Sequence, residues 1–204
     1  MSRSSPGGFA PFDAAAAPIA ETNVDTDQII PARFLSRPRE LGLGECLFRD
    51  LRFDAEGKER ESFVLNQDGF REAGIVVAAR NFGCGSSREN AVWALADYGI
   101  RAVIAPSTGD IFHNNCLKNG ILPALLPEEV VDGFIAALKE TPGTRIGIDL
   151  AAQLVTAPDG TTHRFEIDPF AKHCLLEGID ELSFTLSQEE EIAAFENRYG
   201  RENE

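Results

Sequence analysis

The residues of this chain whose types and spacing best suit chemistry lie in one stretch, residues 81–89, which reads NFGCGSSRE. Ser86 and Ser87 supply two adjacent hydroxyl groups, and Arg88 supplies a planar, permanently charged fork that matches a carboxylate. The glycines on either side of Cys84 let the backbone adopt conformations that a side chain would forbid. Hydroxyls and an arginine behind a glycine turn therefore indicate a binding site for an organic acid.

The elements that flank this stretch are expected to position it. Residues 75–79 are apolar and β-branched, which is typical of a buried strand. Beyond the stretch, Ala91, Leu95 and Tyr98 recur at helical spacing. We expect both serines to occupy helix-cap positions, beside unpaired N–H groups whose partial positive charge favours an anion.

Other functions fit the spacing of this motif less well. Taken alone, G-x-G-S-S favours an ordinary capped helix after a tight turn, with no ligand. Arg88 stands at the third glycine position of a dinucleotide fingerprint, and no Gly-Lys-Ser/Thr follows as in a P-loop. The G-x-S-x-G elbow of serine hydrolases is absent. A nucleophilic Cys84 stays open, because a helix N-terminus lowers a thiol pKa, but the sequence offers it no base.

Length and composition indicate an ordinary globular domain that is strongly acidic. The 204 residues are 43% hydrophobic and 25% charged, enough for one sizeable core. The formal net charge of −14 argues against a nucleic-acid partner, which usually requires a basic patch. An acidic substrate would therefore need a local positive pocket, for which Arg88 is the candidate. No apolar run approaches the length of a membrane span, and no signal peptide is visible.

The cysteines and histidines are spaced too widely to predict a metal site. The four cysteines stand at 46, 84, 116 and 174 and form no C-x-x-C pair, so neither a zinc ribbon nor an iron–sulfur ligand run is expected. The three histidines, at 113, 163 and 173, show no i, i+4 spacing. Reduced thiols in a cytoplasmic protein are the simplest interpretation.

The rest of the chain predicts an α/β domain behind a short leader. Residues 1–17 are rich in Ser, Gly, Pro and Ala and are expected to be a poorly ordered lead-in with one short strand near residues 9–12, so that the domain spans 18–204. Residues 19–31 resemble a polar loop. Residues 47–53 and 62–65 are candidate strands around a turn at 54–58.

Farther along, apolar runs and helical patterns alternate. Strands at 75–79, 101–105 and 121–126 alternate with helices, which predicts parallel βαβ units; the expected helices include 111–118 and 128–138. A hairpin is expected at 146–155 and 163–167 around the Pro-Asp-Gly turn. A helix should run from Asp168 to near Gly178, with a last helix at about 188–199.

The motif also carries a family resemblance. NFGCGSSRE followed by AVWALADYGIRAVIAPS resembles the small-subunit family of 3-isopropylmalate dehydratase, which is similar to the swivelling domain of aconitase. NVDTDQIIPARFL, from Asn23, resembles the loop signature of that family, and residues 168–182 match as well. The resemblance covers about residues 23–186. It implies a single α/β domain with the swivelling β/β/α arrangement of the aconitase C-terminal domain.

The resemblance assigns roles to individual residues. Ser86 corresponds to the catalytic serine that acts as an alkoxide base, and Ser87 and Arg88 correspond to the carboxylate binders. Asp27 matches an acidic residue of the loop signature, with a supporting role in positioning charge. Apart from the resemblance, Arg33, Arg37 and Arg39 follow closely, and the charge of any of them suits a carboxylate; we expect a solvated basic turn for at least two and include Arg33 among the substrate-binding residues.

The implied function is a hydro-lyase that acts only as a heterodimer. The family isomerises 2- and 3-isopropylmalate by dehydration and rehydration in leucine biosynthesis, and its [4Fe–4S] cluster belongs to a separate large subunit. We therefore expect no cofactor in this chain, with the large subunit and a hydroxy-dicarboxylate substrate as partners. Two alternatives stay open: a related hydro-lyase such as homoaconitase or a citraconate or dimethylmalate hydratase, and a non-catalytic module that binds organic acids. Asn90 departs from the histidine that is usual in the family.

Overall fold

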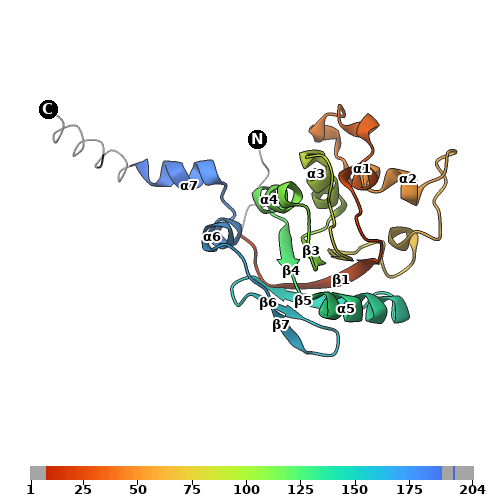
Figure 1. Ribbon diagram of the computed structural model, residues 1–204. Helices are drawn as coiled ribbons and strands as arrows, with labels where there is room; N and C mark the ends of the chain where they lie inside the picture. The colour runs from red at the N-terminus through yellow and green to blue at the C-terminus, as the bar shows by residue number, and fades with distance from the viewer. Residues whose placement is uncertain (1–7, 190–194, 196–204) are drawn as a thin grey trace.

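A mixed seven-stranded sheet forms the centre of the molecule. The computed structural model describes residues 8–189 and Phe195 (Figure 1). The strand order is β4-β3-β2-β1-β5-β6-β7. The strands are β1 (Phe12–Ile19), β2 (Ile75–Ala78), β3 (Ala102–Ala105), β4 (Leu122–Leu125), β5 (Arg145–Asp149), β6 (Leu154–Thr156) and β7 (Thr162–Arg164).

The two halves of the sheet differ in strand direction and meet in β1. Strands β1 to β4 are parallel, as the predicted βαβ units require, and β5, β6 and β7 continue as an antiparallel meander. The first half of β1 pairs with β5, from Phe12 opposite Ile148. Its second half pairs with β2, ending with Ile19 opposite Ala78. The prediction of parallel βαβ units is confirmed.

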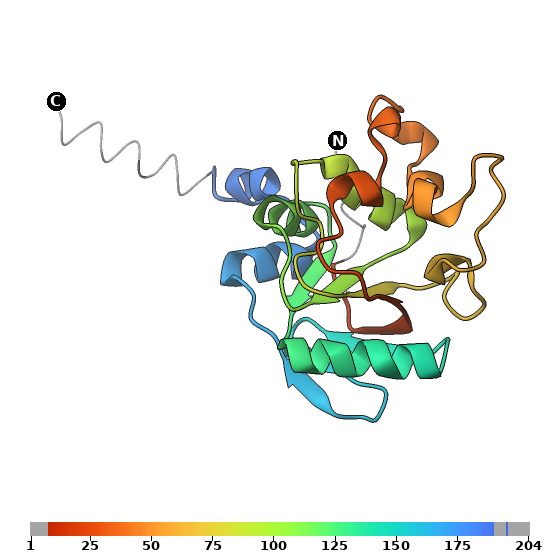
Figure 2. The same ribbon diagram turned by 45° about the vertical axis from the view of Figure 1, so that its right-hand side comes forward.

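Helices cover both faces of the parallel strands. They are α1 (Thr26–Ile29), α2 (Arg49–Arg52), α3 (Glu89–Tyr98), α4 (Asp110–Lys118), α5 (Glu128–Glu140), α6 (Pro169–Glu177) and α7 (Glu181–Ser187). Helix α5 lies on one side of the sheet, and α1, α3 and α4 lie on the other (Figures 1 and 2). Because side chains alternate along a strand, Val76 packs toward α3 while Ile75 and Val77 pack toward α5. Strand β2 is therefore buried on both faces.

The predicted lead-in is wrong where it overlaps β1. Residues 12–17 belong to the central strand, and Ala16 and Ala17 are fully buried. The stretch lacks the β-branched residues that predict a strand, so long-range pairing with β2 and β5 decides its conformation. Pro18 fits there because β5 pairs only with the first half of β1, so no ladder bond to β5 is lost at Pro18.

Two further predicted strands are helical turns. Residues 47–53 contain α2, and residues 62–65 lead into a 3-10 turn at Val64–Asn66. The buried Arg52 and Asn66 side chains hold these segments together: Arg52 Nε donates to Asn66 Oδ1 at 3.1 Å, and Asn66 Nδ2 donates to the Arg52 carbonyl at 2.6 Å. The turn predicted at 54–58 is present, closed by an Asp54 N–H bond to the Lys58 carbonyl.

The remaining elements largely match their predictions. Three 3-10 turns follow α1, namely Ala32–Phe34, Arg39–Leu41 and Gly44–Cys46. The predicted strand at 146–155 divides into β5 and β6, and the hairpin turn at 157–161 joins β6 to β7. Helix α6 begins at an Asp168 cap and ends at Gly178. Helix α7 was not predicted, and most of the helix expected at 188–199 lies outside the described residues. None of the described helices has the length and apolar character needed to cross a membrane.

The glycine turn after β2 is fixed by close backbone packing. Gly83 has φ +70°, and a Cβ there would lie 2.2 Å from Cγ of the Phe112 ring. Gly109 is equally confined, since its Cβ would lie 2.6 Å from the Gly83 carbonyl oxygen. The turn after β2 thus packs directly against the start of α4, with no room for a side chain between them.

We expect Gly83→Ala to lower the free energy of unfolding more than Gly120→Ala. Gly120 has φ +77° and open space around its Cβ position, so it reports the conformational cost alone, about 1–2 kcal/mol. Gly83→Ala adds a clash with Phe112, for which overpacking costs about 1–3 kcal/mol more. Urea denaturation of both variants measures the difference. Equal losses would contradict the packing described here.

Candidate active site

Three loops meet at the carboxyl ends of neighbouring parallel strands. The loop after β2 is bonded on one side to the loop after β1, through the Gly83 N–H and the Val24 carbonyl at 2.7 Å. On the other side the Gly109 N–H, from the loop after β3, donates to the Phe82 carbonyl at 2.9 Å. This edge of a parallel sheet is where α/β proteins commonly bind ligands.

The meeting point encloses a cavity of about 190 Å³. Its lining comes from all three loops: Thr26, Gly83, Gly85, Ser86, Ser87, Arg88, Gly109, Asp110, Ile111 and Phe112. Three of the predicted site residues, Ser86, Ser87 and Arg88, therefore share one cavity. Thr26 and Ile111 are lining residues that the sequence prediction missed, although the parallel order of the strands would have brought the loops after β1 and β3 to the same edge.

The serines do not cap α3, contrary to prediction. The N-cap of α3 is Arg88, and its side chain makes no capping bond. The Ser86 backbone is fixed instead, because Thr26 Oγ1 donates to the Ser86 carbonyl at 2.8 Å and Thr26 is itself buried. Both serine side chains are exposed, and the described residues provide no hydrogen-bond partner for either hydroxyl. Both hydroxyls are thus free to contact a ligand.

Arg88 is paired with Asp27, which comes from α1. Arg88 Nη1 donates to Asp27 Oδ1, and the arginine side chain is only 17% exposed. Helix α1 is held by a capping box in which Asp25 accepts the Gln28 N–H at 2.8 Å and Gln28 Oε1 accepts the Asp25 N–H at 2.9 Å. A turn closed by this capping box therefore presents Asp27 to the guanidinium of Arg88.

Arg33 is not brought to this cavity. Both of its terminal nitrogens donate to Asp50, and its guanidinium lies 4.6 Å from the centre of the Phe34 ring. The hydrogen bonds from Arg33 lower the pKa of the Asp50 carboxyl. Because Arg33 and Asp50 are far apart in sequence, no local sequence pattern indicated that they would pair.

The side chains of the described residues do not fit a metal ion or an iron–sulfur cluster. Across the described ranges, no three His, Cys, Asp or Glu side chains gather closely enough to hold a metal. All four cysteines are free; Cys46 and Cys116 are buried, and complete burial raises the pKa of the Cys116 thiol. The described residues therefore do not bring together the side chains that would ligate an iron–sulfur cluster.

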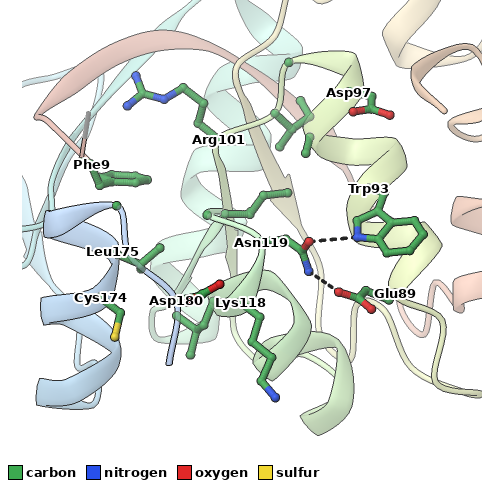
Figure 3. A pocket seen from close by; sticks show the side chains of 18 of the residues that line it. Phe9, Glu89, Trp93, Asp97, Arg101, Lys118, Asn119, Cys174, Leu175 and Asp180 are labelled. Carbon is green, nitrogen blue, oxygen red and sulfur yellow. Dashed lines mark hydrogen bonds between the residues drawn. The ribbon is translucent and has the colours of Figure 1, made fainter. Parts of the chain in front are cut away.

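A larger cleft of about 1030 Å³ lies between α3, α4 and α6 (Figure 3). Within it, the Asn119 side chain accepts a bond from Trp93 Nε1 and donates one to Glu89 Oε1, both at 2.9 Å (Figure 3). The cleft holds no predicted site residue, but Glu89 directly follows Arg88 in sequence. The first turn of α3 is therefore tied to the end of α4.

Comparison with protein families supports the fold and the motifs. The family model described as the aconitase C-terminal domain matches residues 9–129, and a second one, described as LeuD_N, matches residues 134–169. The crystal structure of a 3-isopropylmalate dehydratase (leuD) from Methanocaldococcus jannaschii is similar, with a TM-score of 0.63 and 26% sequence identity. The match covers 91% of this chain and 99% of that one.

Two relatives named 3-isopropylmalate dehydratase small subunit are much closer in sequence. The one from Paramagnetospirillum magneticum is 52% identical over 188 residues, which covers 92% of this chain and 94% of the relative. The one from Rhodospirillum centenum is 54% identical over 190 residues, covering 93% and 94%. With half of its residues identical over nearly its full length, and with the aconitase C-terminal fold, the chain belongs to the 3-isopropylmalate dehydratase small-subunit family.

Proposed function

We propose that this chain is the small subunit of a cytoplasmic 3-isopropylmalate dehydratase, which isomerises 2- and 3-isopropylmalate in leucine biosynthesis. The observation that carries the proposal is the single cavity shared by Ser86, Ser87 and Arg88, in a chain half identical to proteins of that name. The experiment that tests it is turnover of 3-isopropylmalate by this chain mixed with its large subunit, against a panel of other hydroxy acids. Preference for another hydroxy acid would reassign the substrate.

The chemistry requires a base and a cation beside the substrate. A proton leaves the carbon next to a carboxylate, and the hydroxyl on the adjacent carbon leaves as water, which gives an enoic acid. Water then adds back with hydrogen and hydroxyl exchanged between the two carbons. Negative charge builds on the carboxylate as the proton leaves, so a positioned donor or cation stabilises the transition state.

Arg88 is suited to bind that carboxylate. Asp27 occupies one terminal nitrogen of the guanidinium and fixes its plane, and it is the one acidic partner that the described residues give Arg88. The remaining N–H groups of the fork can donate to a substrate carboxylate, for which planar bidentate geometry is the strongest arrangement. Ser87 adds a hydroxyl donor from the adjacent position.

Ser86 is the proposed base. Its hydroxyl is exposed at the cavity, and its main chain is fixed by the bond from Thr26. A serine hydroxyl is a weak base at neutral pH, so its alkoxide needs nearby positive charge. Arg88, which lines the same cavity as Ser86, is the candidate source of that charge.

The departing hydroxyl calls for a Lewis acid, which the described side chains do not assemble. The relatives are named small subunits, which implies a large-subunit partner. We therefore assign the [4Fe–4S] cluster expected for this family to the large subunit. The open cavity at the edge of the sheet is where the two subunits would complete one site.

The isolated chain should bind no stoichiometric iron and show no turnover. The physical reason is that all four cysteines are free and that the described residues gather no three His, Cys, Asp or Glu side chains into a possible metal site. Iron and sulfide analysis of anaerobically purified chain tests this expectation. Stoichiometric iron together with sulfide would overturn the two-subunit assignment.

Arg88→Lys should weaken substrate binding although the charge is kept. A point-charge ammonium does not reproduce two parallel hydrogen bonds, and the loss should be about 1–3 kcal/mol, the scale of hydrogen bonds to charged groups. The assay is kcat and KM with excess large subunit. Arg71→Lys is the matched control, because Arg71 forms a bidentate pair with Glu59 away from the cavity. Equal effects of both variants would remove Arg88 from the site.

Ser86→Ala should abolish turnover while leaving assembly and substrate binding nearly intact. Removal of a general base costs about 10²–10⁴ in rate. Because no capping bond forms at Ser86, the melting temperature should not change. Ser87→Ala is the internal control and should affect KM more than kcat. A mild Ser86→Ala with a severe loss of kcat in Ser87→Ala would reverse the two roles.

A further inference from the structure

In the C-terminal arm, residues 169–187 with helices α6 and α7, helix α7 exposes two large apolar side chains. Leu182 is 67% exposed and Leu186 is 61% exposed. Positions four residues apart lie on the same face of a helix, so the two leucines form one apolar strip along α7. Helix α7 extends outward from the body of the molecule, beyond α6 (Figure 1).

The orientation of this strip is set by the opposite face of α7. Phe184 packs against Phe170 of α6, with ring centres 4.9 Å apart, and against His173 at 5.8 Å. The helix is capped by Asp180, which accepts the Ser183 N–H at 2.7 Å. The leucines therefore point away from α6, whereas Phe184 supplies the contact that holds α7 in place.

The sequence comparisons separate the arm from the rest of the fold. The aconitase C-terminal domain match ends at residue 129, and the second family match ends at residue 169, where the arm begins. A match of 190 residues cannot end before residue 190 of this chain, so the match to the small subunit of Rhodospirillum centenum includes the arm. The arm is thus shared with a separate small subunit but lies outside the matched domain models.

The charges around the strip favour a basic partner over a second copy. Glu177, Glu181 and Glu189 are exposed on or next to the arm. Lys172 turns back toward the sheet, where its Nζ donates to the Ala151 carbonyl at 2.7 Å and to Gln153 Oε1 at 3.0 Å. A second copy would bring the same acidic arm to the contact in a chain of net charge −14, and like charges would oppose pairing.

We propose that the arm docks on the large subunit by inserting Leu182 and Leu186 into an apolar groove with a rim of Lys and Arg side chains. This rests on the proposed function, which requires a large subunit. Because the small subunit is a separate chain, no covalent bond joins it to the large subunit. The arm would attach the two subunits by non-covalent contact. Opposite charges on the arm and the groove would steer the encounter, and burial of the leucines would slow dissociation.

The test is the dissociation constant of the full-length chain for the large subunit. Leu182→Gln/Leu186→Gln should raise Kd at least tenfold, while kcat recovers at saturating large subunit because the cavity is untouched. The melting temperature of the isolated variant checks that the fold is intact. Leu51→Gln is the control, since Leu51 is an exposed leucine on α2, at the other end of the molecule (Figure 1), and should leave Kd unchanged.

Salt separates the charged part of the proposal from the apolar part. The wild-type Kd should weaken between 50 and 500 mM salt, on the order of tenfold, and Glu181→Gln/Glu189→Gln should reduce this dependence. An unchanged Kd in the folded double-leucine variant overturns the proposal. Loss of self-association instead, seen by sedimentation, would assign the strip to a second copy. Failure of the wild-type chain to bind or activate the large subunit would overturn the proposed function itself.

Discussion

The backbone contacts between the loops after β1, β2 and β3 are the constraint on which the site depends. Val24, Gly83 and Gly109 are joined by main-chain hydrogen bonds, and neither glycine has room for a Cβ, because the Phe112 ring confines Gly83 and the Gly83 carbonyl confines Gly109. Hydrogen bonds across these contacts hold three chain segments that are far apart in sequence. The serine pair, Arg88 and Thr26 occupy one cavity because their loops are bonded main chain to main chain. The main-chain contacts between the loops at this edge of the sheet therefore set the positions of the side chains at the site.

The electrostatics of the site follow from one pairing inside a strongly acidic molecule. A chain of net charge −14 repels an anion over most of its surface, so binding requires a local cation. Arg88 is mostly buried and already oriented by Asp27, which limits the side-chain entropy lost when a ligand arrives. The pairing also places the Asp27 carboxylate near the substrate carboxylate, and these two negative charges repel each other. Because Asp27 is half exposed, water can screen that repulsion.

The predictable parts of the structure are those encoded by local pattern. Strands β2, β3 and β4 are β-branched or apolar and were found from sequence, as was the motif that supplies Ser86 and Arg88. Strand β1 was missed because its alanines have no strand preference and are fixed by distant partners. The segment around Arg52 was missed because a buried polar pair, invisible to hydrophobic patterning, decides its conformation.

The site residues show the same division between local and distant information. The serines and Arg88 lie within three consecutive positions, so their proximity could be predicted. The two serines precede Arg88, the N-cap of α3, and Gly85 lies with a φ of +87° in the turn before the helix begins at Glu89. Asp27 came from a family resemblance, and its pairing with Arg88 needed the structure. Arg33 was expected at the site, but the structure pairs it with Asp50.

The divided pairing of β1 has a consequence for how the chain folds during synthesis. Strand β1 leaves the ribosome early, but its partners β2 and β5 are synthesised later. Phe12 can pair with Ile148 only after β5 has emerged. Closing loops of such length is entropically costly, and topologies with distant contacts fold slowly. Until β5 emerges, the first half of β1 is an unpaired edge, which is the kind of surface that recruits other nascent chains. Completion of the sheet is thus a late and cooperative event, governed by residues near position 150 rather than by the motif that binds the ligand.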